Sequence, residues 1–181
     1  MRKILAVLFC LIFIFSFTAC GEKEKKKTEH SVDIEYYAKA GQMPEVNYAL
    51  GSDVEKVKNE LSAEAEKSES VYSVTEGEST VLIDNGEICY YYKKSNPEKG
   101  IDYIVNYGTA FGFPIGSVTV EVKEALDGYS YTEEVLNEEN AFFMFDTENG
   151  SVIKCRFEDN TVLFVFKDNA LCATALLSEH E

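Results

Sequence analysis

The apolar positions that follow the glycine at position 51 recur every three or four residues, which is the period of an α-helix. Val54, Val57 and Leu61 form one face of this helix, and charged side chains lie between them. Ser52 can cap the helix, and Glu55 would complete a capping box, in which two side chains each accept a hydrogen bond from a free backbone N–H. The pattern therefore predicts a helix that begins near residue 52.

A second helix with an apolar face is predicted further along the chain. Val118, Val122, Ala125 and Leu126 lie at helical spacing, and a serine precedes them at the capping position. Gly128 ends this pattern, because glycine readily adopts the left-handed conformation that closes many helices. The second helix is therefore expected to begin at that serine and to end before Gly128.

The two predicted helices open with the same sequence pattern. Each begins with a Gly-Ser pair, at 51–52 and 116–117, and each continues with Val-Lys and a leucine three residues later. Tyr48 and Phe113 occupy matching positions upstream. Such a repeat indicates a duplicated supersecondary unit, and scaffolds of this kind bind partners more often than they catalyse reactions. The acidic segment 62–70 either extends the first helix or forms a loop.

After each predicted helix the apolar positions alternate with a period of two, which is the period of a β-strand. Strands are predicted at 80–83, 88–92, 101–107, 141–145, 152–157, 161–166 and 171–177. Turns are predicted at Asn85-Gly86, Asn149-Gly150, Asp159-Asn160 and Asp168-Asn169. The Asn-Gly pairs favour hairpins because a type I′ turn needs positive φ at two residues. We predict an α+β fold of two tandem repeats, 31–112 and 113–181, each a helix followed by an antiparallel β-meander.

The predicted strands carry apolar or aromatic side chains on both faces. Ile88, Tyr90 and Tyr92 lie on one side of their strand, with Cys89 and Tyr91 on the other. A sheet with one face in water would alternate apolar with polar residues. We therefore expect helices to cover one face and the other to form a shallow aromatic surface. Burial of that second face against the sister repeat is an equal alternative.

Residues 1–20 have the layout of a bacterial export signal. Two basic residues precede an apolar run, 4–17, that is too short to span a bilayer comfortably. The run leads into Phe17-Thr18-Ala19-Cys20-Gly21, which resembles the bacterial lipobox, in which the cysteine becomes the lipidated N-terminus. We expect a lipoprotein anchored to the cell membrane through Cys20 and facing outside the cytoplasm; an ordinary secretory signal is the alternative. The charged residues 21–30 then form a flexible tether.

The chain is strongly acidic, with 32 Asp and Glu residues against 17 Lys and Arg residues and a net charge of −15 at pH 7. Such a surface repels the phosphate backbone, so nucleic acid is a poor partner. The charge favours basic or cationic partners, although solubility alone also explains it.

Three cysteines remain beyond the signal and the lipid site. Cys89, Cys155 and Cys172 each lie in an apolar, strand-like run, where a free cysteine behaves as a small hydrophobe. An odd count argues against a complete disulfide framework, and no pair has the spacing of a zinc site. A Cys155–Cys172 bridge is conceivable, but a meander would place one strand between the two residues.

The sequence carries no recognisable catalytic, cofactor or metal motif. His30 lies in the tether and His180 lies near the C-terminus, so no core histidine is available to activate a nucleophile. Phosphate-binding, dinucleotide-binding and zinc-protease motifs are absent. The segment 146–150 resembles the start of a calcium loop but lacks the later ligands, and a hairpin turn explains it better. We therefore expect no enzymatic activity, no cofactor and no metal.

The repeated pattern resembles a known superfamily. An aromatic residue, two further residues, Gly-Ser and a Val-Lys-x-x-Leu helix before a β-meander are similar to the tandem-repeat fold of β-lactamase inhibitory protein, over about residues 44–177. Small lipoproteins of the outer-membrane assembly machinery share one such unit. The resemblance implies one curved sheet with helices outside and partners docked on its concave, aromatic face. The contact residues it implies are Tyr90, Tyr92, Tyr103, Tyr107, Phe143, Phe157 and Phe164. The inhibitory loop of that family has no counterpart here, so inhibition of β-lactamase is not implied.

Together these patterns predict a non-catalytic module at the cell surface that binds an envelope or extracellular protein or peptide through an aromatic sheet face. The alternative is a module that binds a small ligand or an envelope polymer, such as a glycan, on the same face. A hydrolase with paired carboxylates is a third class, but the sequence cannot select a pair among so many acids.

Overall fold

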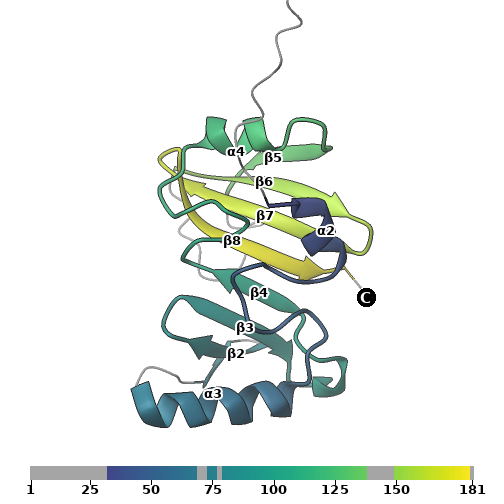
Figure 1. Ribbon diagram of the computed structural model, residues 1–181, viewed down its shortest axis with the longest axis vertical. Coiled ribbons are helices and arrows are strands. Elements are labelled where there is room, and N and C mark those ends of the chain that lie inside the picture. Colours follow the sequence, from purple (N-terminus) through teal and green to yellow (C-terminus); the bar gives the residue numbers. More distant parts are fainter. Residues whose placement is uncertain (1–31, 69–72, 77–78, 138–148, 180–181) are drawn as a thin grey trace, which may run out of the picture.

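The computed structural model describes residues 32–68, 73–76, 79–137 and 149–179. Over these residues the fold is α+β, with one antiparallel sheet and few helices, which confirms the α+β part of the prediction (Figure 1). The helices are α2 (Ile34–Lys39), α3 (Val54–Ser68) and α4 (Thr119–Ala125), with a short 3-10 helix η1 (Pro97–Lys99). The strands are β1 (Ser73–Glu76), β2 (Ser79–Asp84), β3 (Ile88–Lys93), β4 (Tyr103–Asn106), β5 (Tyr131–Val135), β6 (Gly150–Phe157), β7 (Asn160–Lys167) and β8 (Ala170–Ser178). The predicted strand at 141–145 lies outside the described residues, as do the predicted signal and tether.

The sheet is built from two consecutive runs of neighbouring strands that meet in its middle. The strand order is β1-β2-β3-β4-β8-β7-β6-β5, and every neighbouring pair is antiparallel. The two runs join where β4 pairs with β8, with Ile104 opposite Leu176. The last strand of each run is therefore central, and β1 and β5 are the outermost of the described strands.

The hairpin turns follow from the local sequence. Asn85 and Gly86 have φ of 52° and 73°, the two positive values that a type I′ turn requires, so the predicted hairpin is confirmed. Asp168 and Asn169 also combine two positive φ values, 51° and 64°. The turn between β6 and β7 differs from the prediction, because the positive φ belongs to Glu158 rather than to the two residues after it.

Helix α3 begins one residue later than its sequence suggested. The carboxylate of Asp53 accepts a hydrogen bond from the Lys56 N–H at 2.6 Å, so Asp53 is the capping residue and the predicted Ser52–Glu55 capping box is wrong. Aspartate caps a helix well because its carboxylate reaches the free N–H groups of the first turn. The helix continues to Ser68, so the acidic segment extends it.

Helix α4 matches its predicted apolar face only in part. Val122 and Leu126 are buried, and Gly128 has the left-handed φ of 100° that follows the helix end. Val118, expected on the buried face, is exposed instead because it precedes the helix at its N-cap position. Helix α2 was not anticipated; Asp33 caps it by accepting from the Tyr36 N–H at 3.0 Å.

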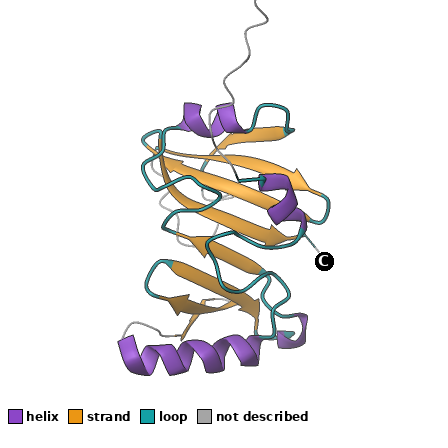
Figure 2. Cartoon of the chain, viewed as in Figure 1, coloured by secondary structure: helices purple, strands orange, loops and turns teal. Residues whose placement is uncertain are grey.

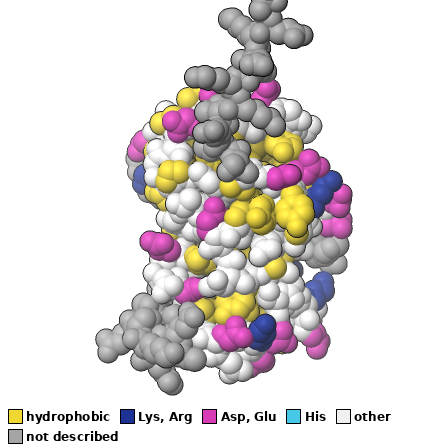
Figure 3. All heavy atoms as spheres, in the orientation of Figure 1, with side chains coloured by type: hydrophobic (Ala, Val, Ile, Leu, Met, Phe, Trp, Pro, Cys, Tyr) yellow, Lys and Arg dark blue, Asp and Glu magenta, His cyan; other side chains and the backbone are white. Residues whose placement is uncertain are grey.

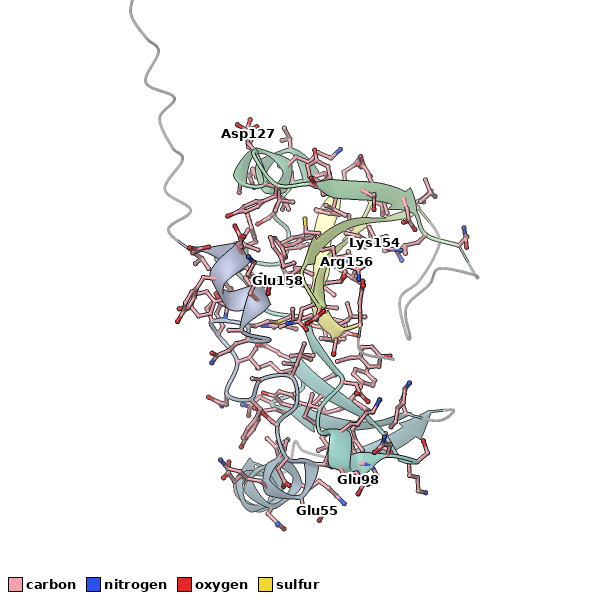
Figure 4. The ribbon with its side chains drawn as sticks, turned by 90° about the vertical axis from the view of Figure 1, so that its right-hand side faces the viewer. Glu55, Glu98, Asp127, Lys154, Arg156 and Glu158 are labelled. Atoms are coloured by element: carbon pink, nitrogen blue, oxygen red, sulfur yellow. The ribbon has the colours of Figure 1, made fainter. Side chains whose placement is uncertain are left out.

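All three α-helices lie on the same side of the sheet and bury one continuous core there (Figure 4). This helix-side core combines apolar residues of the helices with every second residue of the strands. Its members from the helices are Ile34, Ala38, Val54, Val57, Leu61 and Val122, and Leu126 joins them from the C-cap of α4. Its large strand members include Tyr90, Tyr92, Ile104, Phe157, Phe164 and Phe166. Each fully buried side chain of this size stabilises the fold by about 1.5–3 kcal/mol, so this core holds the helices onto the sheet.

A second apolar cluster lies on the opposite face of the sheet. It contains Val81, Ile83, Cys89, Tyr91, Val105, Leu136, Val152, Leu163, Val165, Ala173 and Ala175. These side chains are buried, and they alternate along the strands with those of the helix-side core. The apolar residues on both strand faces thus reflect burial on both sides of the sheet.

The segment between α2 and α3 crosses the sheet and ties its two halves together (Figure 2). The carboxylate of Glu45 accepts hydrogen bonds from the N–H groups of Phe111 and Gly112, both at 3.1 Å. The Asn160 side-chain amide donates to the Ala38 carbonyl at 2.9 Å, which fixes the end of α2 against β7. Charge-assisted bonds to a carboxylate are among the stronger hydrogen bonds, so Glu45 is a firm attachment point.

Candidate binding surfaces

Most of the aromatic residues predicted to contact a partner lie in the helix-side core. Tyr90, Tyr92, Phe157 and Phe164 are all buried beneath the helices. Their placement corrects the expectation that they form an exposed face. The physical reason is that large aromatic side chains fill the space between sheet and helices. Phe143 lies outside the described residues.

The rings of these buried residues pack edge to face against residues of the connecting segments. Tyr90 contacts Tyr48 with ring centroids 5.3 Å apart, and Phe164 contacts Phe113 at 5.7 Å. This geometry is the favoured one for aromatic pairs. Burial also raises the pKa of Tyr90 above its ordinary value. These tyrosines and phenylalanines therefore hold the fold together.

Tyr103 and Tyr107 belong to the opposite face of the sheet. Tyr103 lies directly across from Tyr91 in the β3–β4 register, so its side chain shares the face of Tyr91 and not that of Tyr90. Both Tyr103 and Tyr107 are half-buried against the second apolar cluster. Burial raises the pKa of Tyr107 to about 12. Of the described residues predicted as contacts, only these two remain accessible.

The centre of that opposite face is closed. Tyr91, Val105 and Val165 are almost completely buried there. Basic side chains line its rim, and Figure 4 places Lys154 and Arg156 on the side away from α2. Lys154 pairs with Glu134 at 2.9 Å and Arg156 with Glu179 at 2.7 Å. The predicted open aromatic surface is therefore reduced to two tyrosines at the margin of a buried cluster.

The exposed apolar side chains gather elsewhere. Among the described residues six large hydrophobic side chains are exposed, and five of them come from the segment 115–135. These are Ile115, Val118, Val120, Tyr131 and Val135, which we call the α4–β5 surface. The sixth, Tyr36, lies on α2. Sequence reasoning missed this surface because it assigned the valine before α4 to the core and left β5 unassigned.

The α4–β5 surface lies at one end of the molecule and is acidic as well as apolar. Helix α4 and strand β5 lie together at this end in Figure 1, and Lys123 of α4 contacts Glu133 of β5 at 2.6 Å. This hydrogen bond raises the pKa of the Lys123 ammonium group. Figure 3 shows acidic and hydrophobic side chains next to one another here, and Figure 4 marks Asp127 at the same end.

A cleft of about 410 Å³ opens between α2 and the middle of the sheet. Its polar lining includes Lys39, Lys99, Asp102, Asn160 and Ser178. Lys39 forms ion pairs with two glutamates, one on its own helix and one on the turn after β6, and these raise its pKa. Lys99 makes no ion pair with any described residue. The cleft thus offers one uncommitted cation beside an amide and a carboxylate.

The three cysteines of the folded part are free thiols. Burial raises the pKa of Cys89 and of Cys155 to about 11 each. The pKa of Cys172 is raised as well, again mainly by burial. Thiols with such pKa values are poor nucleophiles at neutral pH.

Chemistry at a metal or a histidine finds no support in the described part of the chain. No cluster of three or more His, Cys, Asp or Glu residues suited to a metal ion is present within it. Both histidines lie outside the described ranges.

Within the described residues, no helix is long and apolar enough to cross a membrane.

Comparison of the chain with protein-family models, with curated proteins and with solved structures found no match.

Proposed function

We propose that this protein is a non-catalytic binding module, anchored to the outside of the cell membrane through a lipid on Cys20, and that it binds another protein or a peptide. The observation that carries the proposal is that five of the six exposed large hydrophobic side chains among the described residues come from the single segment 115–135. Exposed apolar patches on folded domains mark interaction sites. The site differs from the aromatic face expected from sequence, but the class of function is the same.

We further propose that the fold consists of two tandem units, 31–112 and 113–181, as in the superfamily that the sequence resembles. Matching backbone contacts at the Gly-Ser pair before α3 and before α4 support this. Gly51 N–H donates to the Ile101 carbonyl at 2.8 Å, and Gly116 N–H donates to the Leu171 carbonyl at 2.8 Å. Both glycines have positive φ, 74° and 92°.

The neighbours of those glycines match too. Ser52 N–H donates three residues back to Ala49, and Ser117 N–H donates three residues back to Pro114, both at 3.1 Å. The edge-to-face pair of Tyr48 with Tyr90 is also equivalent to the pair of Phe113 with Phe164. The tandem arrangement would give a rigid scaffold whose exposed ends differ, because the α4–β5 surface belongs to the second unit alone.

The lipid anchor rests on the sequence around Cys20. Changing Cys20 to Ala should release the protein from the membrane fraction into the medium or the periplasm. Cell fractionation followed by immunoblotting would measure this, with Cys10→Ala as the matched control that keeps the anchor. Full retention of the Cys20→Ala protein in the membrane would refute the anchor.

The binding proposal is tested by mapping which surface a partner touches. A photoreactive amino acid placed at Val120 or Val135 in the lipoprotein should crosslink to one dominant envelope or extracellular protein on intact cells. The same group at Tyr36, which is equally exposed but lies on α2, should not. Mass spectrometry would identify the product. Equal labelling from all three positions, or none from any, would contradict a specific protein-binding surface.

A second candidate function is binding of a small ligand or a glycan, and the cleft beside α2 favours it. Its volume of about 410 Å³ is within the range of small-molecule sites, and Lys99 is available to pair with an anionic group. Such a ligand should raise the melting temperature of the wild type in a thermal-shift screen. Lys99→Ala should abolish the shift, while Lys94→Ala, outside the cleft, should keep it.

A further inference from the structure

We propose that the outer edge of β5 accepts an extended, basic segment of the partner, which adds to the sheet as a further strand. This inference rests on the function proposed above and names its mode of recognition and the chemistry of the segment. In this mode, backbone hydrogen bonds hold the segment and alternate side chains select it.

The hydrogen-bond pattern of β5 shows which of its backbone groups point outward. Leu136 N–H donates to the Gly150 carbonyl at 2.9 Å, and this pair continues the β5–β6 register. In an antiparallel pair, directly opposed residues alternate between bonded and non-bonded pairs. Thr132 and Glu134 therefore bond to β6, and the N–H and C=O groups of Tyr131 and Glu133 point away from it.

These outward groups are available to a new strand. No described strand lies beyond β5 in the sheet. No hydrogen bond joins the backbone N–H or C=O of Tyr131 or Glu133 to another described residue. Two residues with outward N–H and C=O groups can make up to four ladder hydrogen bonds, which is the footprint of a short extended peptide.

The edge has only part of the usual protection against such pairing. Exposed edges are protected by proline, by bulges and by charged side chains. β5 has the sequence Tyr-Thr-Glu-Glu-Val, without proline, and its register with β6 runs without a shift. Its two glutamates each hold a lysine of this same chain, Lys123 and Lys154.

The side chains along the edge define what the segment should carry. Tyr131 and Val135 are 39% and 73% exposed, and they share one face of the strand with Glu133 between them. Apolar residues four positions apart in the segment would lie opposite these two side chains. A lysine or arginine two positions from each of them, and therefore on the same face of the segment, would lie opposite Glu133.

The charge around this edge favours a basic occupant. Glu121, Glu124 and Asp127 are exposed on α4 and in the loop after it, and with the two glutamates of β5 they outnumber the two nearby lysines. The whole chain has a net charge of −15. Opposite charge steers association and penalises wrong partners. A basic extended segment therefore matches both the outward backbone groups of this edge and its negative charge.

A second copy of this chain fits the same edge poorly. Two-fold pairing of β5 with itself about its central residue would place Glu133 opposite Glu133 of the other copy. Like charges directly opposed on neighbouring strands are unfavourable. Two chains of charge −15 would also repel one another.

The test uses the full lipidated protein in detergent micelles and a synthetic peptide of seven residues, with valine at positions 2 and 6, lysine at position 4 and threonine elsewhere, so that the two valines and the lysine share one face. The peptide should bind and protect the backbone amides of Tyr131 and Glu133 from hydrogen exchange. A peptide with glutamate in place of lysine should bind at least about tenfold more weakly, given the charge at this edge. A peptide with N-methyl groups on alternate amides should not bind, because it lacks the donors for the ladder.

Two substitutions at Glu133 separate the contribution of its backbone N–H to peptide binding from that of its charge. Glu133→Pro removes an outward N–H that β6 does not use, and proline is tolerated at such edge positions. Glu133→Gln removes the same carboxylate but keeps the N–H. We expect Glu133→Pro to weaken peptide binding by at least about tenfold, because this variant loses a backbone donor to the added strand. The affinity of Glu133→Gln for the peptide should stay within about threefold of the wild type, because this variant keeps that donor. Circular dichroism would check that both variants fold.

The outcomes separate this inference from the proposed function. Equal binding by the two variants, or undiminished binding of the N-methylated peptide, overturns strand addition. Equal binding of the glutamate peptide overturns the preference for a basic segment. If the photocrosslinks at Val120 and Val135 persist in such a case, the proposed function stands and only this mode of recognition is lost. Absence of both crosslinks and peptide binding removes the two together.

Discussion

Gly100 lies in close backbone contact with Gly51. A Cβ atom at this position would lie 2.5 Å from the carbonyl carbon and oxygen of Gly51. Its φ of 85° is in the region that residues with side chains rarely adopt. The contact joins the end of η1 to the turn before α3, next to the Gly51–Ile101 hydrogen bond. Glycine is required here for two independent reasons.

Replacing Gly100 by Ala should therefore destabilise the protein by about 3 kcal/mol, because strain and a steric clash act together. Gly86→Ala is the matched control: its φ is 73°, but nothing lies within 4 Å of the added Cβ. It should cost about 1 kcal/mol from backbone strain alone. Urea unfolding measures both free energies of unfolding, and equal losses would contradict the close approach of Gly100 to Gly51.

At the scale of elements, α3 shows how a cap is chosen by geometry rather than by residue type. Ser52 and Asp53 are adjacent and both are good capping residues. Ser52 is instead engaged in the turn before the helix, where its backbone bonds to Ala49 and Ile101. Asp53 is then the first residue whose carboxylate can reach the N–H of Lys56.

Changing Asp53 to Ala should lower the free energy of unfolding by about 1 kcal/mol, as loss of an N-cap does. Ser52→Ala should change it by less than about 0.5 kcal/mol, because no side-chain cap is lost. Thermal and urea unfolding of the two variants would report the difference. A larger loss of unfolding free energy for Ser52→Ala than for Asp53→Ala would show that Ser52 caps the helix, as the sequence predicted.

Two of the elements that sequence analysis missed, β5 and α2, were missed for the same physical reason. β5 has exposed side chains at four of its five positions, so it carries no buried face and no alternation of apolar and polar residues. Helix α2 is six residues long and buries only Ile34 and Ala38. Pattern analysis detects burial, and elements that bury little are set by pairing and capping instead.

At the scale of the whole molecule, one sheet separates two apolar clusters, and each contains a cysteine. Cys155 lies in the helix-side core and Cys89 in the cluster on the opposite face. Cys172 is half-buried at the rim of the second cluster. The three thiols therefore differ in how deeply the fold buries them.

We predict that a thiol reagent labels Cys172 first in the native protein. With pKa values near 11, Cys89 and Cys155 hold only about one thiolate per thousand molecules at pH 8, and their burial further restricts access. Labelling of Cys89 and Cys155 should accelerate about tenfold per pH unit between pH 7 and 9, because the thiolate is the reactive form and both pKa values lie near 11. Mass spectrometry of a Cys10→Ser, Cys20→Ser protein would follow each site. Fast native labelling of Cys155 would contradict its place in the core.

Much of the fold follows from patterns along the chain. The period of the apolar residues located α3, α4 and six strands, and Asn85-Gly86 set a hairpin turn through its backbone preferences. The candidate site could be predicted from the sequence far less well than the fold. Aromatic residues on a strand look the same in sequence when they fill a core and when they meet a partner, so Tyr90 and Phe164 were expected on a surface and lie in the interior.

The sequence by itself determined that alternate side chains of each strand form two apolar faces, because that alternation is a local property of extended backbone. It also determined the acidic charge and the lipobox-like segment at the N-terminus. Only the tertiary structure decided that β4 pairs with β8, that the helices cover the face of Tyr90, and that β5 is the last of the described strands on its side of the sheet. These outcomes depend on contacts between residues far apart in the chain, which local spacing does not encode.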